Sequence, residues 1–165
     1  QRMNYQYLDT PIGNLRLLSD GVQLVNIEFA GQYGANDAIE NSDAVLAACA
    51  AQLTDYFVGK RRRFDLPLAP RGTPFQLSVW AALANIPYGQ VRSYRDIART
   101  IGNPAAVRAV GAANGRNPLP IVVPCHRVIA SNGALTGFAG GLEIKRFLLG
   151  LEGAAGASRH RQPVG

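Results

Sequence analysis

The chain has 165 residues, of which 47% are hydrophobic, and a formal net charge of +6. This is enough apolar material for one or two small domains with a packed core. No apolar run approaches the roughly 20 residues needed to span a bilayer, and residues 1–5 lack the apolar core of a signal peptide. Two cysteines, Cys49 and Cys125, are too few for a disulfide framework. We expect a globular protein of the reducing cytoplasm without membrane contact.

The charge is distributed unevenly about residues 66–72, a segment rich in Pro and Gly that predicts a linker. Residues 1–70 hold 6 Lys/Arg and 8 Asp/Glu, whereas residues 71–165 hold 11 Lys/Arg and 3 Asp/Glu. We therefore predict two domains, 1–70 and 71–165, of which only the second is basic. A basic domain favours a polyanionic partner, with a solvated face that binds nothing as the alternative. The four cations at 60–63 are interpreted as solvated surface, and a secondary DNA contact is the less favoured interpretation.

The first half has the pattern of a small sheet and one helix. Runs rich in β-forming residues at 4–8, 14–18 and 23–29 are separated by turn residues and predict an antiparallel meander. Residues 42–57 repeat apolar side chains at a spacing of about 3.6 residues, which predicts an amphipathic helix that covers one face of the sheet. Cys49 lies on this apolar stripe, so we expect it to be an inert core residue.

The second half is predicted to be mainly helical. The sequence Thr-Pro-Phe-Gln at 73–76 is a helix start signal, and the helix is expected to reach about residue 85 with Trp80 in the core. A second helix is predicted over 93–101. Asn-Pro at 103–104 is expected to cap a third helix directly, which would run to about residue 115. Two helices joined by so tight a turn form a candidate helix-turn-helix.

The third predicted helix carries small apolar side chains and a single long charged one, Arg108. It lacks the Arg, Gln and Asn side chains that distinguish bases in the major groove, which disfavours a sequence-specific repressor. A slim helix suits the narrow minor groove, where one long side chain can enter the base stack. Taken alone, Arg108 has a simpler interpretation as a solvated surface arginine.

Cys125, within Pro-Cys-His-Arg-Val at 124–128, is the candidate nucleophile. The apolar run at 121–123 predicts burial, which raises the pKa of a thiol, so activation needs a partner. His126 is adjacent, but neighbours on a regular strand point to opposite faces, so the pair works only if the strand is broken there or a water bridges them. A third group would have to orient the imidazole, and Glu143 and Glu152 are the only carboxylates that follow.

A metal site is not expected. The two cysteines and the two histidines, His126 and His160, show none of the paired spacings of zinc ligands, and residues 1–70 contain no histidine. No cofactor is predicted.

Pro-Cys-His-Arg-Val, with Arg-Ala-Val-Gly at 108–111 and Asn-Pro upstream and Gly-Gly-Leu at 140–142 downstream, resembles the O6-alkylguanine-DNA alkyltransferases, also called methylated-DNA–protein-cysteine methyltransferases. The resemblance covers nearly the whole chain and is most specific over 73–152. It implies an α+β protein with a small ribonuclease-H-like α/β domain and a mainly helical, winged helix-turn-helix-like domain. It also implies DNA repair, in which the alkyl group of a flipped-out O6-alkylguanine passes irreversibly and stoichiometrically to Cys125.

The resemblance further implies roles for individual residues. His126, oriented by Glu152, would deprotonate Cys125 through a water, and Asn117 would link the recognition helix to the active-site segment. Arg108 would fill the place of the flipped nucleotide. Tyr94 would rotate the target phosphate and hydrogen-bond the guanine. The other expected contacts are Ser93, Arg95, Ala105 and Ala109 with DNA, and the carbonyls of Cys125 and Val128, the amide of Ala139, Phe138 and Trp80 with the guanine.

Two residues depart from the family pattern, since Phe138 and Ala139 stand where Tyr and Ser are frequent. The contact to O6 should survive because it comes from an amide, but any contribution of the two hydroxyls is absent. The zinc of some eukaryotic members is not expected, because the first domain lacks the histidines.

The expected partner is double-stranded DNA that contains O6-alkylguanine, bound in the minor groove largely without regard to sequence. The protein would act as a monomer that can assemble cooperatively on DNA. The chief alternative function is a thiol-based, DNA-binding regulator that senses oxidants or alkylators. A cysteine hydrolase is a second alternative, although no oxyanion site can be recognised in the sequence.

Overall fold

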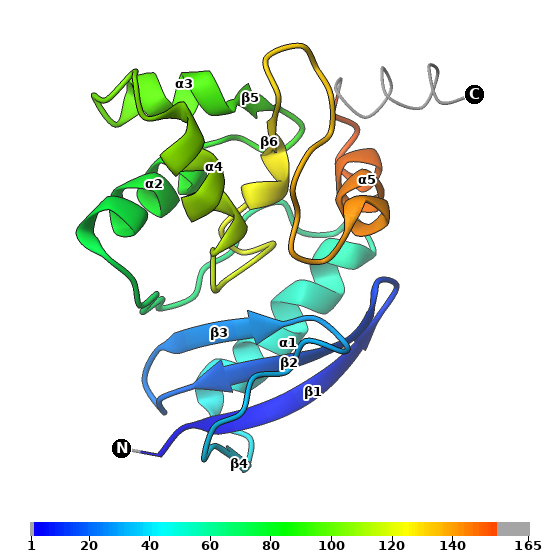
Figure 1. Cartoon of the computed structure of the whole chain (residues 1–165). Coiled ribbons are helices and arrows are strands. Elements are labelled where there is room, and N and C mark those ends of the chain that lie inside the picture. Colours follow the sequence, from blue (N-terminus) through cyan, green and yellow to red (C-terminus); the bar gives the residue numbers. More distant parts are fainter. Residues whose placement is uncertain (1, 155–165) are drawn as a thin grey trace. The chain divides into compact units, whose positions relative to one another are not determined.

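The fold is described from a computed structural model that defines residues 2–154, so that residue 1 and residues 155–165, including His160, lie outside the described part (Figure 1). The chain folds into two compact units, Gln1–Arg71 and Gly72–Gly165. No helix within residues 2–154 is both long and apolar enough to cross a lipid bilayer.

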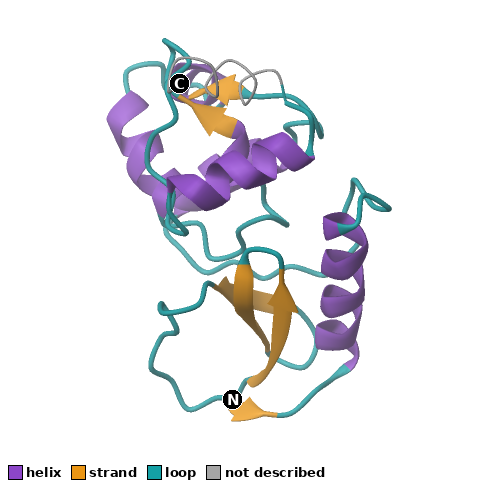
Figure 2. Ribbon diagram, turned by 90° about the vertical axis from the view of Figure 1, so that its right-hand side faces the viewer, coloured by secondary structure: helices purple, strands orange, loops and turns teal. Residues whose placement is uncertain are grey.

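The first unit is a four-stranded sheet with one helix packed against it (Figures 1 and 2). Strands β1 (Asn4–Thr10), β2 (Gly13–Ser19) and β3 (Leu24–Glu28) form the predicted antiparallel meander. A short strand that was not predicted, β4 (Ile39–Glu40), pairs in parallel with β1, so the order across the sheet is β3-β2-β1-β4.

Helix α1 (Ala44–Phe57) supplies the apolar cover for this sheet. Its N-cap is Asp43, whose carboxylate accepts a hydrogen bond from the amide of Leu46 and so satisfies a first-turn N–H group. The apolar stripe predicted from the spacing is buried. Cys49 on this stripe is fully buried, and burial raises the pKa of its thiol to about 12. The predicted core position of Cys49 is confirmed.

The second unit is built mainly from helices. Helices α2 (Pro74–Ala84), α3 (Tyr94–Thr100) and α4 (Val107–Gly115) pack against one another, and α5 (Leu142–Leu151) contacts the turn that carries Cys125. The start signals of α2 and α3 are confirmed, because each begins with a reciprocal capping box. The two boxes are formed by Thr73 with Gln76 and by Ser93 with Asp96.

The predicted start of α4 is wrong. The helix begins at Val107 and not directly after Asn103 and Pro104, because the amide of Ala106 donates to the carbonyl of Asn103 at 3.0 Å and closes a turn that contains the proline. Ala106 is the N-cap and offers no side-chain cap. Ala105, expected on the recognition helix, therefore lies in the preceding turn.

Candidate active site

Cys125 begins a single 3-10 turn, η1 (Cys125–Arg127), which leads into strand β6 (Val128–Ile129). Strand β6 pairs in parallel with β5 (Arg92–Ser93), directly before α3. The turn interrupts the extended backbone, so Cys125 and His126 do not alternate across a sheet as neighbours on a strand would. Cys125 is 4% exposed and His126 is fully buried. The strand is thus broken at this point, which is one of the two arrangements under which the pair was expected to work.

The backbone before Cys125 has an unusual conformation that Asn117 fixes. Ile121 has φ 76°, in the left-handed region that β-branched residues rarely occupy and that costs about 1–3 kcal/mol. Asn117 bridges this bend, because its Nδ2 donates to the carbonyl of Val123 at 2.8 Å and its Oδ1 accepts from the amide of Leu119 at 3.0 Å. Asn117 therefore joins the end of α4 to the cysteine segment.

A buried charge network surrounds Glu152. Its Oε2 is 2.7 Å from Nε2 of His126, and Arg127 donates to the same carboxylate from Nε at 2.7 Å and from its terminal nitrogen at 3.0 Å. Burial favours the neutral acid, but His126 and Arg127 outweigh it and lower the pKa of Glu152 to about 2. Glu152 is therefore an ionised acceptor, and Nε2 of His126 must carry the proton that it receives.

The protonation state of His126 follows from this arrangement. Burial lowers its pKa below the ordinary value although Glu152 opposes that shift, so the imidazole is neutral at pH 7. With the proton on Nε2, the free lone pair is on Nδ1, and this atom has no hydrogen-bond partner among the described residues. Of the two candidate carboxylates, the structure brings Glu152 to the histidine, whereas Glu143 lies exposed at the start of α5.

Arg127 holds the network in place and was not singled out from the sequence. Besides Glu152, it donates to the carbonyl of Ile86 at 2.7 Å, and its guanidinium lies over the ring of Tyr88 at 5.6 Å. These contacts compensate the burial of the arginine.

Lys145 is a second residue that sequence analysis missed. It lies on α5, is fully buried, and donates from Nζ to the carbonyls of Val128 at 2.6 Å and Thr136 at 2.7 Å. Burial lowers the pKa of Lys145 to about 8, although the nearby Cys125 opposes the shift. Burial also raises the pKa of Cys125 to about 11, against the Asn117 side chain and the Lys145 charge, which both favour the thiolate. The resting thiol is protonated, so its reaction needs a base.

Tyr94, the first residue of α3, reaches the same loop as Lys145. Its hydroxyl donates to the carbonyl of Thr136 at 3.3 Å and accepts from the Thr136 hydroxyl at 3.1 Å. Burial raises the pKa of the phenol, although the hydrogen bond from Thr136 opposes that shift. The hydroxyl is therefore a neutral hydrogen-bond donor close to the cysteine.

The expected DNA contacts lie on the surface of the helix-turn-helix. Arg108 and Ala109 of α4, Ala105 in the preceding turn and Arg95 of α3 are all exposed. Arg108 makes no hydrogen bond or ion pair within the described part of the chain, which leaves its guanidinium available. Ser93 uses its hydroxyl oxygen to accept from the amide of Asp96.

The expected guanine contacts fall into two groups. Val128 is buried next to the cysteine, and its amide donates to the Cys125 carbonyl, whereas Phe138 and Ala139 lie in the loop between β6 and α5. Trp80 lies in the core, as its helical position predicts. Its indole N–H donates to the Ala113 carbonyl of α4 at 2.8 Å.

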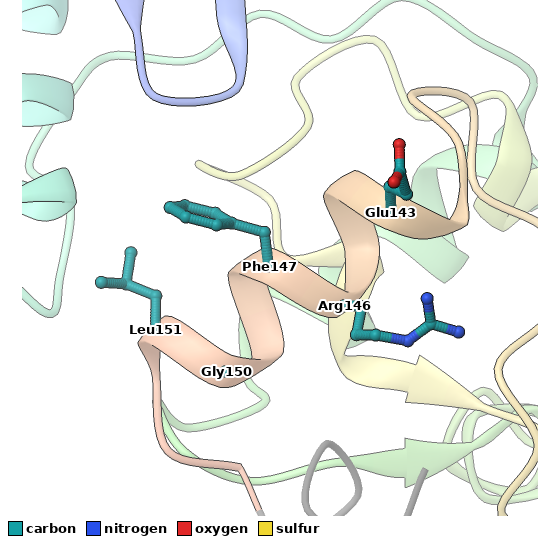
Figure 3. Close-up of a pocket in the computed structure, with 5 residues that line it drawn as sticks. All are labelled: Glu143, Arg146, Phe147, Gly150 and Leu151. Atoms are coloured by element: carbon teal, nitrogen blue, oxygen red, sulfur yellow. The ribbon is translucent and has the colours of Figure 1, made fainter. Parts of the chain in front are cut away.

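A pocket of about 470 Å³ lies along α5 (Figure 3). None of its lining residues is a predicted site residue. They are Glu143, Arg146, Phe147, Gly150 and Leu151. Residues 2–154 also contain no group of three or more His, Cys, Asp or Glu side chains placed to hold a metal ion.

Two family models match the chain, one for each half. The model described as "6-O-methylguanine DNA methyltransferase, ribonuclease-like domain" matches residues 3–70, and "6-O-methylguanine DNA methyltransferase, DNA binding domain" matches residues 74–154.

Individual proteins are similar over nearly their whole length. The methylated-DNA–protein-cysteine methyltransferase of Methanosarcina acetivorans is 49% identical over 155 residues, which cover 92% of this chain and 99% of that protein. The constitutive enzyme of the same name from Bacillus subtilis is 47% identical over 155 residues, covering 90% of this chain and 94% of that protein. The crystal structure of Mycobacterium tuberculosis OGT in complex with DNA superimposes with a TM-score of 0.86 at 46% identity, covering 93% of this chain and 96% of that one.

These matches define the fold class, an α+β chain with a ribonuclease-like domain followed by a helical DNA-binding domain, and they confirm that prediction. The chain belongs to the 6-O-methylguanine DNA methyltransferase family.

Proposed function

We propose that this protein repairs double-stranded DNA by transferring the alkyl group of O6-alkylguanine to its own Cys125. The observation that carries this proposal is the buried thiol beside a neutral His126 whose far nitrogen is bound to Glu152. Family membership supplies the reaction class, DNA repair by methyl transfer to a protein cysteine. The geometry supports Cys125 as the acceptor, because the other cysteine is in the core of the first unit.

The proposed chemistry begins with removal of the thiol proton. His126 accepts it at Nδ1 through a water, and the resulting imidazolium is stabilised by Glu152. The thiolate of Cys125, stabilised by the Lys145 charge, attacks the alkyl carbon in line with the bond to O6. A C–S bond forms, the C–O6 bond breaks, and its electron pair remains on the guanine. The amide of Ala139 and the hydroxyl of Tyr94, once it turns from the Thr136 carbonyl to the guanine, are the donors proposed to stabilise that charge.

The thioether product has no easy hydrolytic exit. Each molecule therefore acts once and remains alkylated. This makes the protein a single-turnover methylated-DNA–protein-cysteine methyltransferase.

The target base must leave the duplex to reach a thiol that is 4% exposed, at a cost of a few kcal/mol for lost stacking and pairing. We assign Arg108 to the vacated position in the stack, because it is exposed and is the only long side chain in the first turns of α4. The small residues around it suit the minor groove. Phosphate contacts from the basic second unit make binding salt-dependent and nearly independent of sequence.

On this proposal the protein binds as a monomer that can assemble cooperatively along the duplex, and it works in the cytoplasm, where it reaches DNA. A thiol-based regulator is not favoured. Sensor cysteines have a low pKa and are accessible, whereas burial raises the pKa of Cys125 to about 11, and α4 has no array of base-reading side chains.

A duplex with a single O6-methylguanine, labelled in the methyl group, tests the function. The label should move from DNA to the protein, and Cys125→Ser should abolish the transfer. Cys49→Ala is the matched control and should transfer normally, because that thiol is inert in the core. Label that stays on the DNA, or that reaches Cys49, contradicts the proposal.

A further inference from the structure

Two buried side-chain atoms in the described part of the chain have no hydrogen-bond partner in the protein, and both lie beside Cys125. One is Nδ1 of His126, the next residue, and the other is Oδ1 of Asn114. Asn114 is on α4, is 2% exposed, and directs its Nδ2 to the Cys125 carbonyl at 3.4 Å. A buried polar atom left without a partner costs about 1–3 kcal/mol. Two such atoms on residues next to Cys125 point to a shared partner.

Both atoms are acceptors. Nδ1 of His126 accepts because the ring proton is on Nε2, bound to Glu152. Oδ1 of Asn114 is a carbonyl oxygen, and the amide nitrogen of that side chain is already used on Cys125. A water has two O–H groups, one for each acceptor, and a lone pair that can receive the thiol S–H. One water therefore matches the three groups.

We propose that Asn114 is a positioning residue for alkyl transfer, whose Oδ1 acts together with Nδ1 of His126 to hold the water that receives the Cys125 proton. This inference rests on the function proposed above. In the transfer, the S–H bond breaks and its proton joins the water, while the water passes one of its own protons to Nδ1. The water is regenerated and the thiolate forms. The hydrogen bond to Asn114 persists throughout, so the water stays aligned between sulfur and nitrogen.

The charged and titratable groups around this relay lie on other elements. Lys145 of α5 and Tyr94 of α3 influence Cys125, and Glu152, Arg127 and Lys145 influence His126. The sole charged residue of α4, Arg108, is exposed. Replacing Asn114 by an uncharged residue changes no charge at the thiol. A change in pH dependence would thus report on the water.

The test follows the alkylation of Cys125 by free O6-benzylguanine between pH 6 and pH 10. Asn114→Leu keeps the branched shape and the number of heavy atoms while it removes both polar atoms. The rate at pH 7 should fall about tenfold, a part of the 10²–10⁴ typical of general base catalysis. The loss should shrink at higher pH, where the thiolate forms without the relay. Asn114→Ala, a smaller change to the packing, should show the same shift, so the test does not depend on one variant folding.

A double-mutant comparison separates the relay from a structural effect. In a His126→Ala background, measured at pH 9, Asn114→Leu should slow the reaction no further. Equal losses with and without His126 would overturn the inference. Val110→Ala is the control, because Val110 is a fully buried apolar residue of the same helix. It should lower stability but leave the pH profile unchanged, and a shift like that of Asn114→Leu would also overturn the inference.

A failure of the proposed function and a failure of the role of Asn114 give different experimental results. If the wild-type protein does not react with O6-benzylguanine or with alkylated DNA, the proposed function fails and the inference with it. If the wild type reacts and Asn114→Leu has the wild-type pH profile, only the role of Asn114 is lost.

Discussion

His126 and Glu152 are 26 residues apart in the sequence, yet Nε2 of the first lies 2.7 Å from Oε2 of the second, with both side chains fully buried. The pair orients the imidazole and fixes its tautomer. Since Arg127 binds the same carboxylate, a single anion holds both the imidazole and the guanidinium.

Glu152→Gln should therefore impair both stability and activity. It leaves Arg127 buried without its counter-charge, which should lower the free energy of unfolding by about 3 kcal/mol in a urea titration. It also frees the orientation of His126, so alkylation by O6-benzylguanine should slow at neutral pH. Glu143→Gln is the matched control on the exposed start of α5 and should change neither quantity. Equal behaviour of the two variants would contradict the assignment.

The free energy of unfolding should fall on acidification in two pH ranges. Burial lowers the pKa of His126 below its ordinary 6.5, so the unfolded chain gains a proton that the folded one resists, and stability declines as pH drops below about 6.5. The pKa of Glu152 is lowered from 4.5 to about 2, so its contribution is complete above pH 5 and is lost toward pH 2. That loss is on the order of 3 kcal/mol. Urea titrations from pH 7 to pH 3 should show the decline, and it should be shallower below pH 5 in Glu152→Gln. Parallel curves would exclude Glu152 as its source.

Lys145→Met removes the charge beside Cys125 and keeps a long apolar side chain. The thiol pKa should rise, so alkylation should slow several-fold at pH 7 and recover partly at high pH. The loop between β6 and α5 also loses the hydrogen bond from Lys145 to the Thr136 carbonyl, so the amide hydrogens of this loop should exchange faster with solvent. Arg146→Met, the neighbouring residue on α5, serves as control. An unchanged pH profile for Lys145→Met would show that the lysine is structural only.

Arg108→Ala should separate base flipping from chemistry. Repair of O6-methylguanine in duplex DNA should slow at least tenfold, whereas reaction with free O6-benzylguanine should stay near the wild-type rate, because the free base needs no extrusion. Arg116→Ala, an exposed arginine at the other end of α4, controls for the loss of a positive charge. Similar losses on both substrates for Arg108→Ala would count against its role in the stack.

Much of the fold was predictable because its signals are local. Ser93 and Asp96 are three residues apart and form their cap within one turn, so the start of α3 can be read from the sequence alone. The start of α4 could not be read in the same way. Asn103 and Pro104 are equally compatible with the start of a helix and with a turn. The structure has the turn, which is closed by the hydrogen bond from the amide of Ala106 to the carbonyl of Asn103. Two-residue strands such as β4 have no periodicity to detect.

Residues of the candidate site could be predicted where the family resemblance or the apolar spacing along a helix indicated their position. Lys145 had an overlooked signal, since it shares an apolar face of α5 with Leu148 and Leu149 at spacings of three and four residues. Its acceptors are the main-chain carbonyls of Val128 and Thr136, which leave no mark in a sequence. Asn114 was hidden for a related reason, because its unmatched oxygen appears only when the burial of α4 is known.

The most direct test of the central claim is the intact mass of the protein after incubation with an excess of duplex DNA that contains O6-methylguanine. We expect one added methyl group per chain, located on Cys125, with no further repair once every molecule is modified. Cys125→Ser should keep its original mass. Repair that continues beyond one lesion per chain, or lesions lost while Cys125 stays unmodified, would contradict it.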